Sequence, residues 1–410
     1  MIAPSSYGAL SATSANTIKG NKPELVGRTV AKKLGFEVGG TPYSEVVGNI
    51  NPSTAKEFDK DLKLNEFVPK SLLLSDLTVG ANYSDVDGDV AHTTAPFTLG
   101  SASRKWYESN GALISDETKN LGCSGFRLPL TLKISVPVQV HSNYGAPRDG
   151  APDVLEQSYK ITTLGFCFAK PNSLTWWDAN GSANSNTGNA TPSPIRGGGY
   201  NSDHFVSGKG FKASTSPKFP TTGFPGAEFT LIMTSNANDY TFSSNSSAVT
   251  VDTTGKVTLN SKPSGAVTIK AIFKNDTSQV HSYTFNPTSV WVRPTGASSQ
   301  GTYAWAKTQC GSESNIPTRA DLTNTPLKNL AAGGSIISNY FTRAVGGGVF
   351  GEWGYTNSSN YPGSRWYSSY HCWYWTRDPY SSEGQFNVHS SYGYVHWRYT
   401  SGSYYVACLE

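Results

Sequence analysis

The sequence has no long apolar run and little charge. Among its 410 residues, no stretch approaches the roughly 18 consecutive apolar residues that a membrane-spanning helix needs, so no membrane span is expected in this chain. Charged residues make up 15% of the sequence, against about 25% in an average soluble domain. The net charge is +4, and no dense cluster of Lys and Arg is interleaved with aromatic residues, which argues against nucleic acid as a partner.

The N-terminus lacks the features of a secretory signal. Residues 1–20 contain neither a basic start nor a continuous apolar segment, so a signal is either absent or already removed, with Met1 as an added start. Their small and polar residues predict a disordered leader. The closing Leu409-Glu410 could equally be a cloning remnant, so the sequence leaves open whether the chain is whole or a fragment.

Cysteine is scarce, and its five positions give no metal-binding pattern. No Cys-x-x-Cys pair and no cluster of Cys and His with zinc spacing occurs. Because five is odd, at least one thiol is unpaired. The sequence leaves two alternatives open: five buried thiols without a disulfide, or one or two disulfides. Asp85, Asp87 and Asp89 begin like a calcium loop, but its twelfth position, where Glu is needed, is Pro96, so a turn is predicted. No metal or other cofactor is expected.

Signatures of catalysis are missing as well. The seven histidines are dispersed, no Gly-x-Ser-x-Gly motif occurs, and the glycines at 197–199 are not followed by the Lys and Ser/Thr of a phosphate loop. The chain is therefore predicted not to be an enzyme.

The sequence does contain a β pattern with many turns. Apolar residues alternate with period two from Leu130 to Val140, which predicts a half-buried strand. Trp106 stands where a sandwich would bury a central aromatic residue. Between residues 22 and 75, two stretches are compatible with short helices, one of them capped by Ser53.

A second β-rich region follows a polar stretch. Residues 171–224 are rich in Gly, Ser, Asn and Pro and are interpreted as a linker or an insertion. From residue 225 onward, five β-prone runs follow one another at the spacing of a sandwich. Val249–Leu259 is predicted to be a hairpin in which Gly255 supplies the left-handed turn position.

The last hundred residues differ in kind. Thr302–Cys310 is compatible with a short amphipathic helix, and Thr318 followed by Asp321 predicts a capped helix start. From Gly351 to Cys408 the sequence holds 5 Trp, 11 Tyr and 1 Phe in 58 residues, so the aromatic side chains are concentrated here.

Part of this aromatic region is a candidate for contact with a partner. Recognition residues usually lie on loops, and Tyr, Trp and Arg most often anchor interfaces. Packing of the same side chains in a core is the equal alternative. The receptor-binding candidates are Tyr355, Tyr361, Arg365, Trp366, Tyr367 and Tyr370, with Arg377, Asp378 and Tyr380 as a second group.

Several motifs resemble the passenger region of the intimin/invasin family of bacterial surface adhesins. In residues 226–294, AVTVDTTGKVTL, PSGAVTIKA and SYTFNP are similar to a bacterial immunoglobulin-like domain. In residues 302–408, TYAWAKTQC, IPTRADL, FGEWG, YWTRD and SYYVACL resemble the family's C-type-lectin-like cap. Residues 77–140, with YSDVDGD, KWYESNG and LTLKISVPV, resemble an immunoglobulin-like module of secreted companion proteins of the ZirS type.

The resemblance implies a mainly β fold, in which tandem immunoglobulin-like β-sandwiches are followed by a C-terminal α+β C-type-lectin-like domain. The expected domains are a leader at 1–20, an immunoglobulin-like module with an N-terminal extension at 21–170, the linker or insertion at 171–224, a bacterial immunoglobulin-like domain at 225–296 and the lectin-like domain at 297–410.

The family also implies a disulfide between Cys310 and Cys408. It would close a loop of roughly a hundred residues, for which the loop-entropy model gives about 4–5 kcal/mol, and it would require an oxidising compartment. Cys123 and Cys167 are a possible second pair within the first module, which would leave Cys372 as a buried free thiol.

Two binding modes known in related folds are disfavoured by the residues present. The Glu-Pro-Asn or Gln-Pro-Asp triplet and the Trp-Asn-Asp strand of calcium-dependent sugar-binding lectins do not occur. Integrin binding of the invasin type uses an Asp shortly after the first cap cysteine, and Glu313 is the only acid in that stretch here.

These expectations together predict a virulence-associated bacterial adhesin that is secreted or displayed on the outer-membrane surface. Its cap would bind a receptor on a host or bacterial surface, and this receptor is expected to be a protein. Two alternatives remain open. One is a secreted effector or modulator exported with an invasin-like outer-membrane partner, and the other is a calcium-independent glycan-binding protein.

Overall fold

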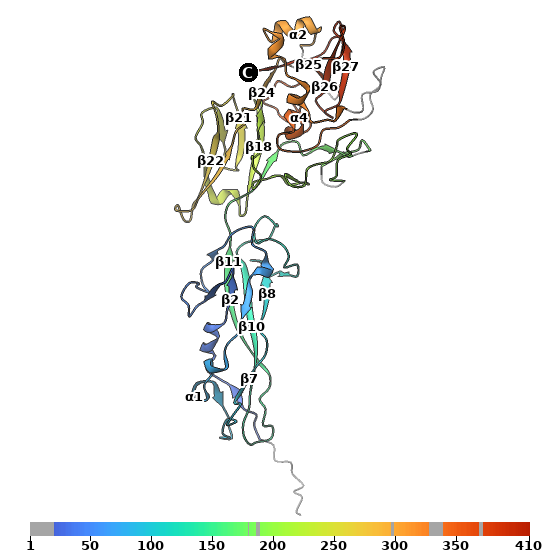
Figure 1. The fold of residues 1–410 in the computed structure, drawn as a ribbon. Coiled ribbons are helices and arrows are strands. Elements are labelled where there is room, and N and C mark those ends of the chain that lie inside the picture. The colour runs from blue at the N-terminus through green and yellow to red at the C-terminus, as the bar shows by residue number, and fades with distance from the viewer. Residues whose placement is uncertain (1–19, 179, 186–188, 297–298, 328–338, 369–371) are drawn as a thin grey trace, which may run out of the picture. The chain divides into compact units, whose positions relative to one another are not determined.

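The computed structural model describes residues 20–178, 180–185, 189–296, 299–327, 339–368 and 372–410. The chain divides into two compact units, unit 1 from Met1 to Thr163 and unit 2 from Leu164 to Glu410 (Figure 1). Almost all of the predicted leader, residues 1–19, lies outside the described residues. Within the described parts of the chain, no helix is both long and apolar enough to span a membrane.

Unit 1 is built around the long strand β10 (Leu130–Val140). The residues of β10 alternate between buried and more exposed positions, so the predicted half-buried strand is confirmed. It pairs antiparallel with β11 (Asp153–Thr162), β8 (Ser103–Tyr107) and β7 (Phe97–Leu99). Trp106 on β8 is fully buried and makes an edge contact with Phe67, with ring centroids 5.1 Å apart.

Shorter elements surround this sheet. A three-stranded sheet has the order β3-β2-β5, β1 pairs with β6, and β4 and β9 are edges of the large sheet. Their bounds are β1 Glu24–Leu25, β2 Gly35–Val38, β3 Thr41–Ser44, β4 Lys56–Glu57, β5 Val68–Lys70, α1 Val79–Asn82, β6 Tyr83–Ser84 and β9 Leu113–Ile114, with 3₁₀ helices at Arg28–Lys33, Leu64–Glu66 and Leu74–Asp76.

The helix expected after Ser53 is wrong. The backbone N–H of Ser53 donates to the side chain of Asn51 in a local turn. The chain then enters β4, whose Lys56 pairs in parallel with Ile161 on β11. The sheet edge therefore determines the conformation of this segment against its local helix propensity.

Unit 2 begins with a two-sheet sandwich. One sheet has the order β15-β16-β12-β18-β21-β20 and the other β19-β22-β23. The predicted hairpin is confirmed, because β20 pairs with β21 and Gly255 at the turn has φ +79°. The strands are β12 Phe166–Pro171, β15 Phe205–Val206, β16 Gly210–Lys212, β18 Ala227–Met233, β19 Tyr240–Ser244, β20 Val249–Val251, β21 Lys256–Leu259, β22 Val267–Phe273 and β23 Val280–Phe285.

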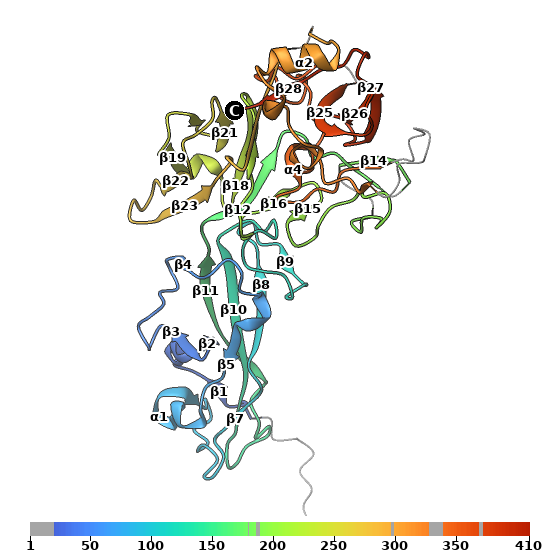
Figure 2. The ribbon, with the colours of Figure 1, turned by 45° about the horizontal axis from the view of Figure 1, so that its top comes forward.

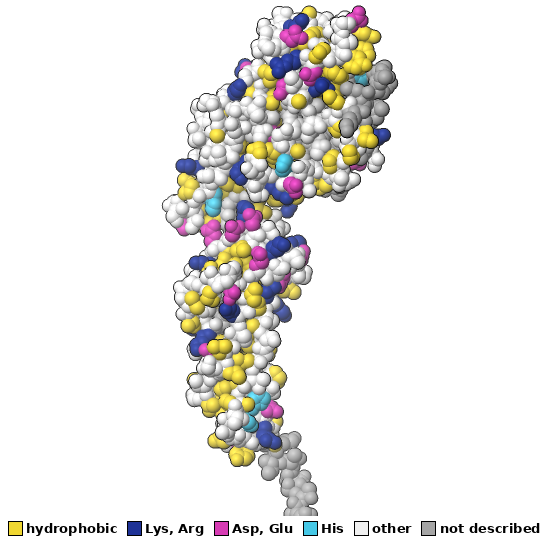
Figure 3. Space-filling view, viewed as in Figure 1, with side chains coloured by type: hydrophobic (Ala, Val, Ile, Leu, Met, Phe, Trp, Pro, Cys, Tyr) yellow, Lys and Arg dark blue, Asp and Glu magenta, His cyan; other side chains and the backbone are white. Residues whose placement is uncertain are grey.

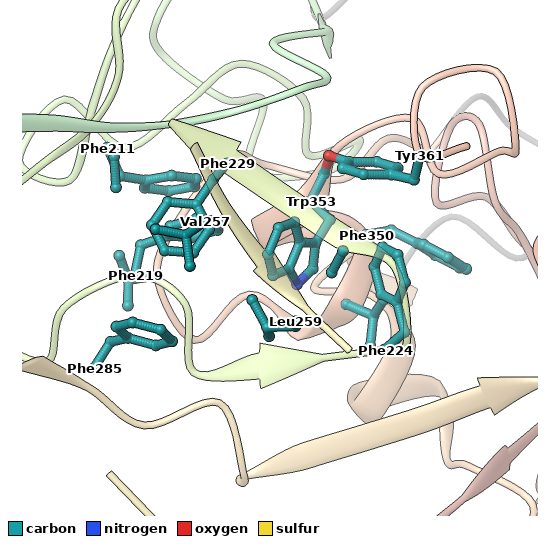
Figure 4. Packing of buried hydrophobic residues seen from close by; sticks show 14 of the residues in the cluster. Phe211, Phe219, Phe224, Phe229, Val257, Leu259, Phe285, Phe350, Trp353 and Tyr361 are labelled. Atoms are coloured by element: carbon teal, nitrogen blue, oxygen red, sulfur yellow. The ribbon is translucent and has the colours of Figure 1, made fainter. Parts of the chain in front are cut away.

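The stretch 171–224 is an insertion that packs into unit 2 rather than a linker. It contains β13 (Trp176–Trp177), β14 (Ala183–Asn184), β15, β16 and β17 (Thr222–Gly223). Its buried rings belong to the main core of unit 2, as Figure 4 shows for Phe211, Phe219 and Phe224. The strand before it, β12, was expected in the first module but pairs with β18 of the sandwich. Unit 2 therefore starts at Leu164, several residues before the expected boundary at 170.

The C-terminal part of unit 2, from residue 299 on, is called the cap here. Its helices are α2 (Tyr303–Gln309), α3 (Arg319–Leu322) and α4 (Gly348–Trp353). The predicted helix starts are confirmed, since the Thr302 and Thr318 hydroxyls accept from the N–H groups of Trp305 and Asp321. The cap sheet has the order β25-β26-β27 (Figure 2), and a second sheet, β17-β24-β28, pairs the cap strand β28 with a strand that precedes the cap. Their strands are β24 Val290–Pro294, β25 Trp373–Pro379, β26 Gly384–His389, β27 Val395–Tyr399 and β28 Ala407–Leu409.

The sandwich and the cap share one hydrophobic core. Trp353 of α4 contacts Phe219 and Phe224 of the insertion and Phe229 of β18, with ring centroids 4.9, 5.3 and 6.2 Å away (Figure 4). The backbones also meet: a Cβ on Gly226 would lie 2.1 Å from the carbonyl carbon of Gly363. Only a glycine fits there, so the cap is held directly against the sandwich.

Candidate receptor-binding surface

The surface of the cap carries an aromatic patch at one end of the β25-β26-β27 sheet. We define the patch as Tyr380, Trp397 and Tyr399. Tyr380 stacks on Trp397 with ring centroids 4.8 Å apart and planes 7° apart, and Tyr399 meets Trp397 edge-on at 5.0 Å. Tyr380 and Tyr399 are 41% and 58% exposed. These are large rings held at a protein surface, which is typical of interface anchors.

Strand register explains why these rings meet. Trp397 and Tyr399 are two residues apart on β27, so their side chains leave the sheet on the same face. Trp397 lies opposite Phe386 on β26. Tyr380 follows the end of β25, where its N–H donates to the carbonyl of Gly384, 2.9 Å away, and its ring meets Phe386 at 5.5 Å.

Charged groups beside the patch are tied to the cap. The Asp378 carboxylate accepts from the backbone N and the Nε of Arg319, at 2.7 and 2.9 Å. The Arg319 guanidinium lies 4.4 Å from the ring centre of Phe386. Arg377 donates to the carbonyl of Ser314 at 2.5 Å. Of the second candidate group, Arg377 and Asp378 therefore make structural contacts, while Tyr380 remains exposed.

Two residues of the first candidate group belong to the core, so the sequence interpretation of them as contact residues is wrong. Tyr361 and Trp366 are both fully buried. Burial raises the pKa of Tyr361, whose hydroxyl donates to the carbonyl of Trp353. Trp366 packs edge-on against Phe224 at 5.5 Å. The insertion supplies this covering ring, and local sequence does not reveal such a distant neighbour.

The other members of the first group are spread over different environments. Tyr355 is half-buried and Arg365 is exposed. Tyr367 is half-buried and stacks on Tyr405, with ring centroids 4.7 Å apart. Burial raises the pKa of Tyr405 to about 12. Tyr370 lies outside the described residues. In the described part of the structure, no ring contact joins Tyr355, Arg365 or Tyr367 to the aromatic patch.

The predicted cap disulfide is present. The Cys310 and Cys408 sulfurs are bonded across 98 residues of sequence, with Cα atoms 5.2 Å apart. The bond joins the end of α2 to β28. Cys372 is buried and not disulfide-bonded, and burial raises the pKa of its thiol to about 12.

The other two cysteines do not both belong to the first module. Neither Cys123 nor Cys167 is a free thiol. Cys167 lies on β12 in unit 2, and Cys123 lies in unit 1. Their pairing with each other stays a prediction.

Two buried charged residues, Arg343 and Glu352, hold the insertion against the cap. The sequence analysis did not predict their role. The Arg343 guanidinium donates to the carbonyls of Ser173, Thr175 and Glu352 at 2.8–3.0 Å. It is fully buried, and burial lowers its pKa to about 10. The Glu352 carboxylate accepts from N–H and hydroxyl groups of Thr221 and Thr222 at 2.6–3.1 Å.

These contacts make Arg343 and Glu352 a structural link between the insertion and α4. Burial raises the pKa of Glu352, although its hydrogen bonds with Gly346, Thr221 and Thr222 act in the opposite direction. The only sequence signal was the position of Glu352 in VFGEWG, where an acid stands between apolar residues that face a core.

The described residues contain no group of three or more His, Cys, Asp and Glu side chains that could hold a metal ion. In the Asp-rich turn of unit 1, the Asp85 carboxylate accepts from the N–H of Asp87, at 2.9 Å. The carboxylate of Asp87 accepts from the side chain of Asn21, also at 2.9 Å. The first is a contact within the turn, and the second joins the turn to a residue 66 positions earlier in the sequence.

Comparisons with known proteins found one matching family model and several similar solved structures. The family model for invasin domain 4 matches residues 202–285. The structure of invasin, a bacterial integrin-binding protein, is 18% identical over 76% of this chain, with a TM-score of 0.38; the chain covers 58% of the invasin chain. The C-terminal 282-residue fragment of intimin, solved with the intimin-binding domain of the translocated intimin receptor Tir, is 17% identical, with a TM-score of 0.35. This similarity covers 81% of the present chain and 95% of the fragment.

Intimin from EHEC O157:H7, solved as a mutant, is 22% identical over 47% of this chain and 89% of its own, with a TM-score of 0.32. The curated proteins gave no match. The predicted fold class, mainly β with sandwich modules followed by an α+β cap, is confirmed. Residues 202–285 thus match a domain of invasin, in the part of the chain whose motifs resemble the intimin/invasin family of adhesins.

Proposed function

We propose that this chain is a bacterial adhesin, secreted or displayed at the cell surface, whose cap binds a protein receptor through the aromatic patch. The observation that carries the proposal is the exposure of Tyr380 and Tyr399 beside Trp397. Rigid aromatic side chains lose little conformational entropy when they are covered, so they anchor protein interfaces efficiently.

The rigid arrangement of the patch, and a similar protein known in complex with its receptor, support this proposal. Its rings are fixed by a sheet that packs on a shared core, so they are already arranged before a partner arrives. A family relative, intimin, was solved in complex with its protein receptor Tir. In the present chain the receptor would lie on a host or bacterial surface.

The test uses the full chain and single substitutions in the patch. Tyr380→Ala and Tyr399→Ala should each weaken binding to receptor-bearing cells roughly tenfold, the effect of removing an interface anchor worth about 1–2 kcal/mol. The control is Tyr144→Ala, which removes a 69% exposed ring from unit 1. Circular dichroism should show all three variants folded. Unchanged binding by both patch variants would contradict the proposal.

A stacked pair of rings at a surface also suits the flat face of a sugar, which keeps a calcium-independent glycan ligand as the second candidate. In that case the full chain should bind a glycan array equally with and without EDTA, and Tyr380→Ala should abolish the signal. Silence on a broad array together with capture of a purified receptor protein would select the protein ligand.

A further inference from the structure

Unit 1 contains a polar hollow that the proposed function does not use. It has a volume of about 420 Å³ and is lined by residues that include His92, Thr98, His141, Arg148 and Asp149. Figure 3 shows histidine side chains reaching the surface of unit 1 near an acidic side chain. The volume falls within the range of about 300–1,000 Å³ that small-molecule sites occupy.

The sheet register brings these residues together from distant parts of the sequence. Thr98 on β7 lies opposite Gln139 on β10, so His141, two residues further along, projects on the same face. Beyond the end of β10, His141 pairs with Asp149 in an isolated bridge. The N–H of His92 donates to the carbonyl of His141 at 2.8 Å.

His141 is held by both ring nitrogens. Its Nδ1 lies 2.6 Å from the Asp149 carboxylate, and its Nε2 lies 2.7 Å from the Thr98 hydroxyl. An ionised carboxylate can only accept, so Nδ1 carries the proton. In the neutral ring Nε2 then accepts from Thr98. His141 is therefore a positioning residue that fixes Asp149 and Thr98 at the edge of the hollow.

Two other donors at the hollow are available to a ligand. Nδ1 of His92 accepts from the N–H of Ala95 at 3.1 Å, so in the neutral ring the proton is on Nε2. Within the described parts of the chain, neither this Nε2 nor the guanidinium of exposed Arg148 has a hydrogen bond or an ion pair. Arg presents a planar fork that matches a carboxylate with two parallel hydrogen bonds.

We propose that this hollow binds a carboxylated sugar. The carboxylate of the sugar accepts from Arg148 and His92, and its hydroxyl groups donate to the remaining lone pairs of Asp149 and Thr98. A neutral sugar lacks the anion that Arg148 requires. An inorganic anion such as phosphate offers at most two hydroxyl donors, which lie beside its own charge, so it cannot place them on Asp149 and its charge on Arg148 as a sugar does. The mixture of free donors and a fixed acceptor thus selects a ligand with both kinds of group.

The site lies in unit 1 and is independent of the cap. Its ligand could come from a host glycan or from a bacterial polysaccharide, since both contain sugars that bear carboxylates. Loss of this site would leave receptor binding by the aromatic patch unchanged, so each proposal can fail without the other.

The experiment measures binding of acidic monosaccharides to the full chain by isothermal titration calorimetry and ligand-observed NMR. The probes are N-acetylneuraminic acid for the host source, galacturonic acid for the bacterial source, and galactose and inorganic phosphate as comparisons. At least one acidic sugar should bind, and galactose and phosphate should bind at least tenfold more weakly. Whichever acidic sugar binds more tightly identifies the source.

The variants assign the binding to the hollow. Arg148→Ala should weaken it at least tenfold, and Arg148→Lys should retain part of it because the charge remains without the fork. The matched control is Arg127→Ala, which removes another exposed arginine of unit 1 and should bind as the unchanged protein does. No binding of either acidic sugar, equal binding of phosphate, or equal losses in Arg148→Ala and Arg127→Ala would overturn the proposal.

Discussion

At the scale of single residues, Arg343 concentrates several contacts in one buried side chain. Its guanidinium donates to three carbonyls from two segments far apart in the sequence, and it also faces the rings of Phe205 and Phe211 at 5.0 and 5.5 Å. Burying a guanidinium is costly unless its donors are used, and both terminal nitrogens of Arg343 make these hydrogen bonds. Together with the Glu352 carboxylate, which accepts from Thr221 and Thr222, this side chain fastens the insertion to α4.

Replacing this side chain should destabilise unit 2. Arg343→Met keeps most of the volume but leaves the carbonyls of Ser173, Thr175 and Glu352 without a donor. Each unsatisfied buried group costs about 1–3 kcal/mol, partly offset because no charge is buried any longer. We expect a net loss of about 3 kcal/mol in the free energy of unfolding, measured by urea denaturation.

The control for that measurement is Arg196→Met, which changes an exposed arginine of the insertion. A surface substitution of this kind should stay within about 0.5 kcal/mol of the original protein. Equal stability of the two variants would show that Arg343 does not fasten the insertion.

At the scale of elements, the disulfide and the strand pair β24–β28 act on the same end of the cap. β28 pairs with β24, and its residue Cys408 is bonded to Cys310 at the end of α2. The disulfide restrains β28 in the unfolded chain, and pairing with β24 holds the same strand in the folded chain.

Removing the bond should weaken the cap strongly. The loop-entropy model gives about 4–5 kcal/mol for a closed loop of this length. Cys310→Ser with Cys408→Ser should lower the free energy of unfolding of unit 2 by this order, measured by urea denaturation under non-reducing conditions. Adding a reductant to the original protein, which also reduces the disulfide-bonded Cys123 and Cys167, should cause at least this loss. A reductant that leaves the stability unchanged would contradict this role of the bond.

At the scale of the whole molecule, the chain consists of two compact units with separate hydrophobic cores. Calorimetry of the full chain should therefore show two unfolding transitions. Trp106→Ala, which truncates a fully buried ring of unit 1, should lower only one of them, because such a change costs about 3–5 kcal/mol in its own core. Arg343→Met should lower only the other. A single transition that both variants shift would contradict two independent cores.

Local patterns predicted individual elements better than they predicted the core. The alternation from Leu130 to Val140 indicated β10 because a strand that buries one face needs that period. Trp366 and Tyr361 looked like surface rings because the residues around them are typical of turns. Phe224 covers both rings from another part of the chain, with centroids 5.3 and 5.5 Å away.

The sites show the same limit. Tyr380 was among the predicted contact residues, but Trp397 and Tyr399 join it only through the register of β26 and β27. Likewise, His141 meets Thr98 and Asp149 only once β10 has paired with its neighbours. Such pairings depend on which strands meet, and a single sequence does not specify this directly.

The disulfide has a consequence for an adhesin that is pulled by its receptor. Cys310 and Cys408 are 98 positions apart, and because the bond joins them, a pull on the aromatic patch can extend only the shorter arm of this loop, from the patch to Cys408. The longer arm, the 69 residues between Cys310 and Tyr380, stays out of the stretched tether; at about 3.4 Å for each extended residue, this is roughly 230 Å of chain. A bacterium bound through the aromatic patch would therefore stay close to the receptor-bearing surface even when the cap unfolds, because the disulfide limits how far the unfolded cap can extend.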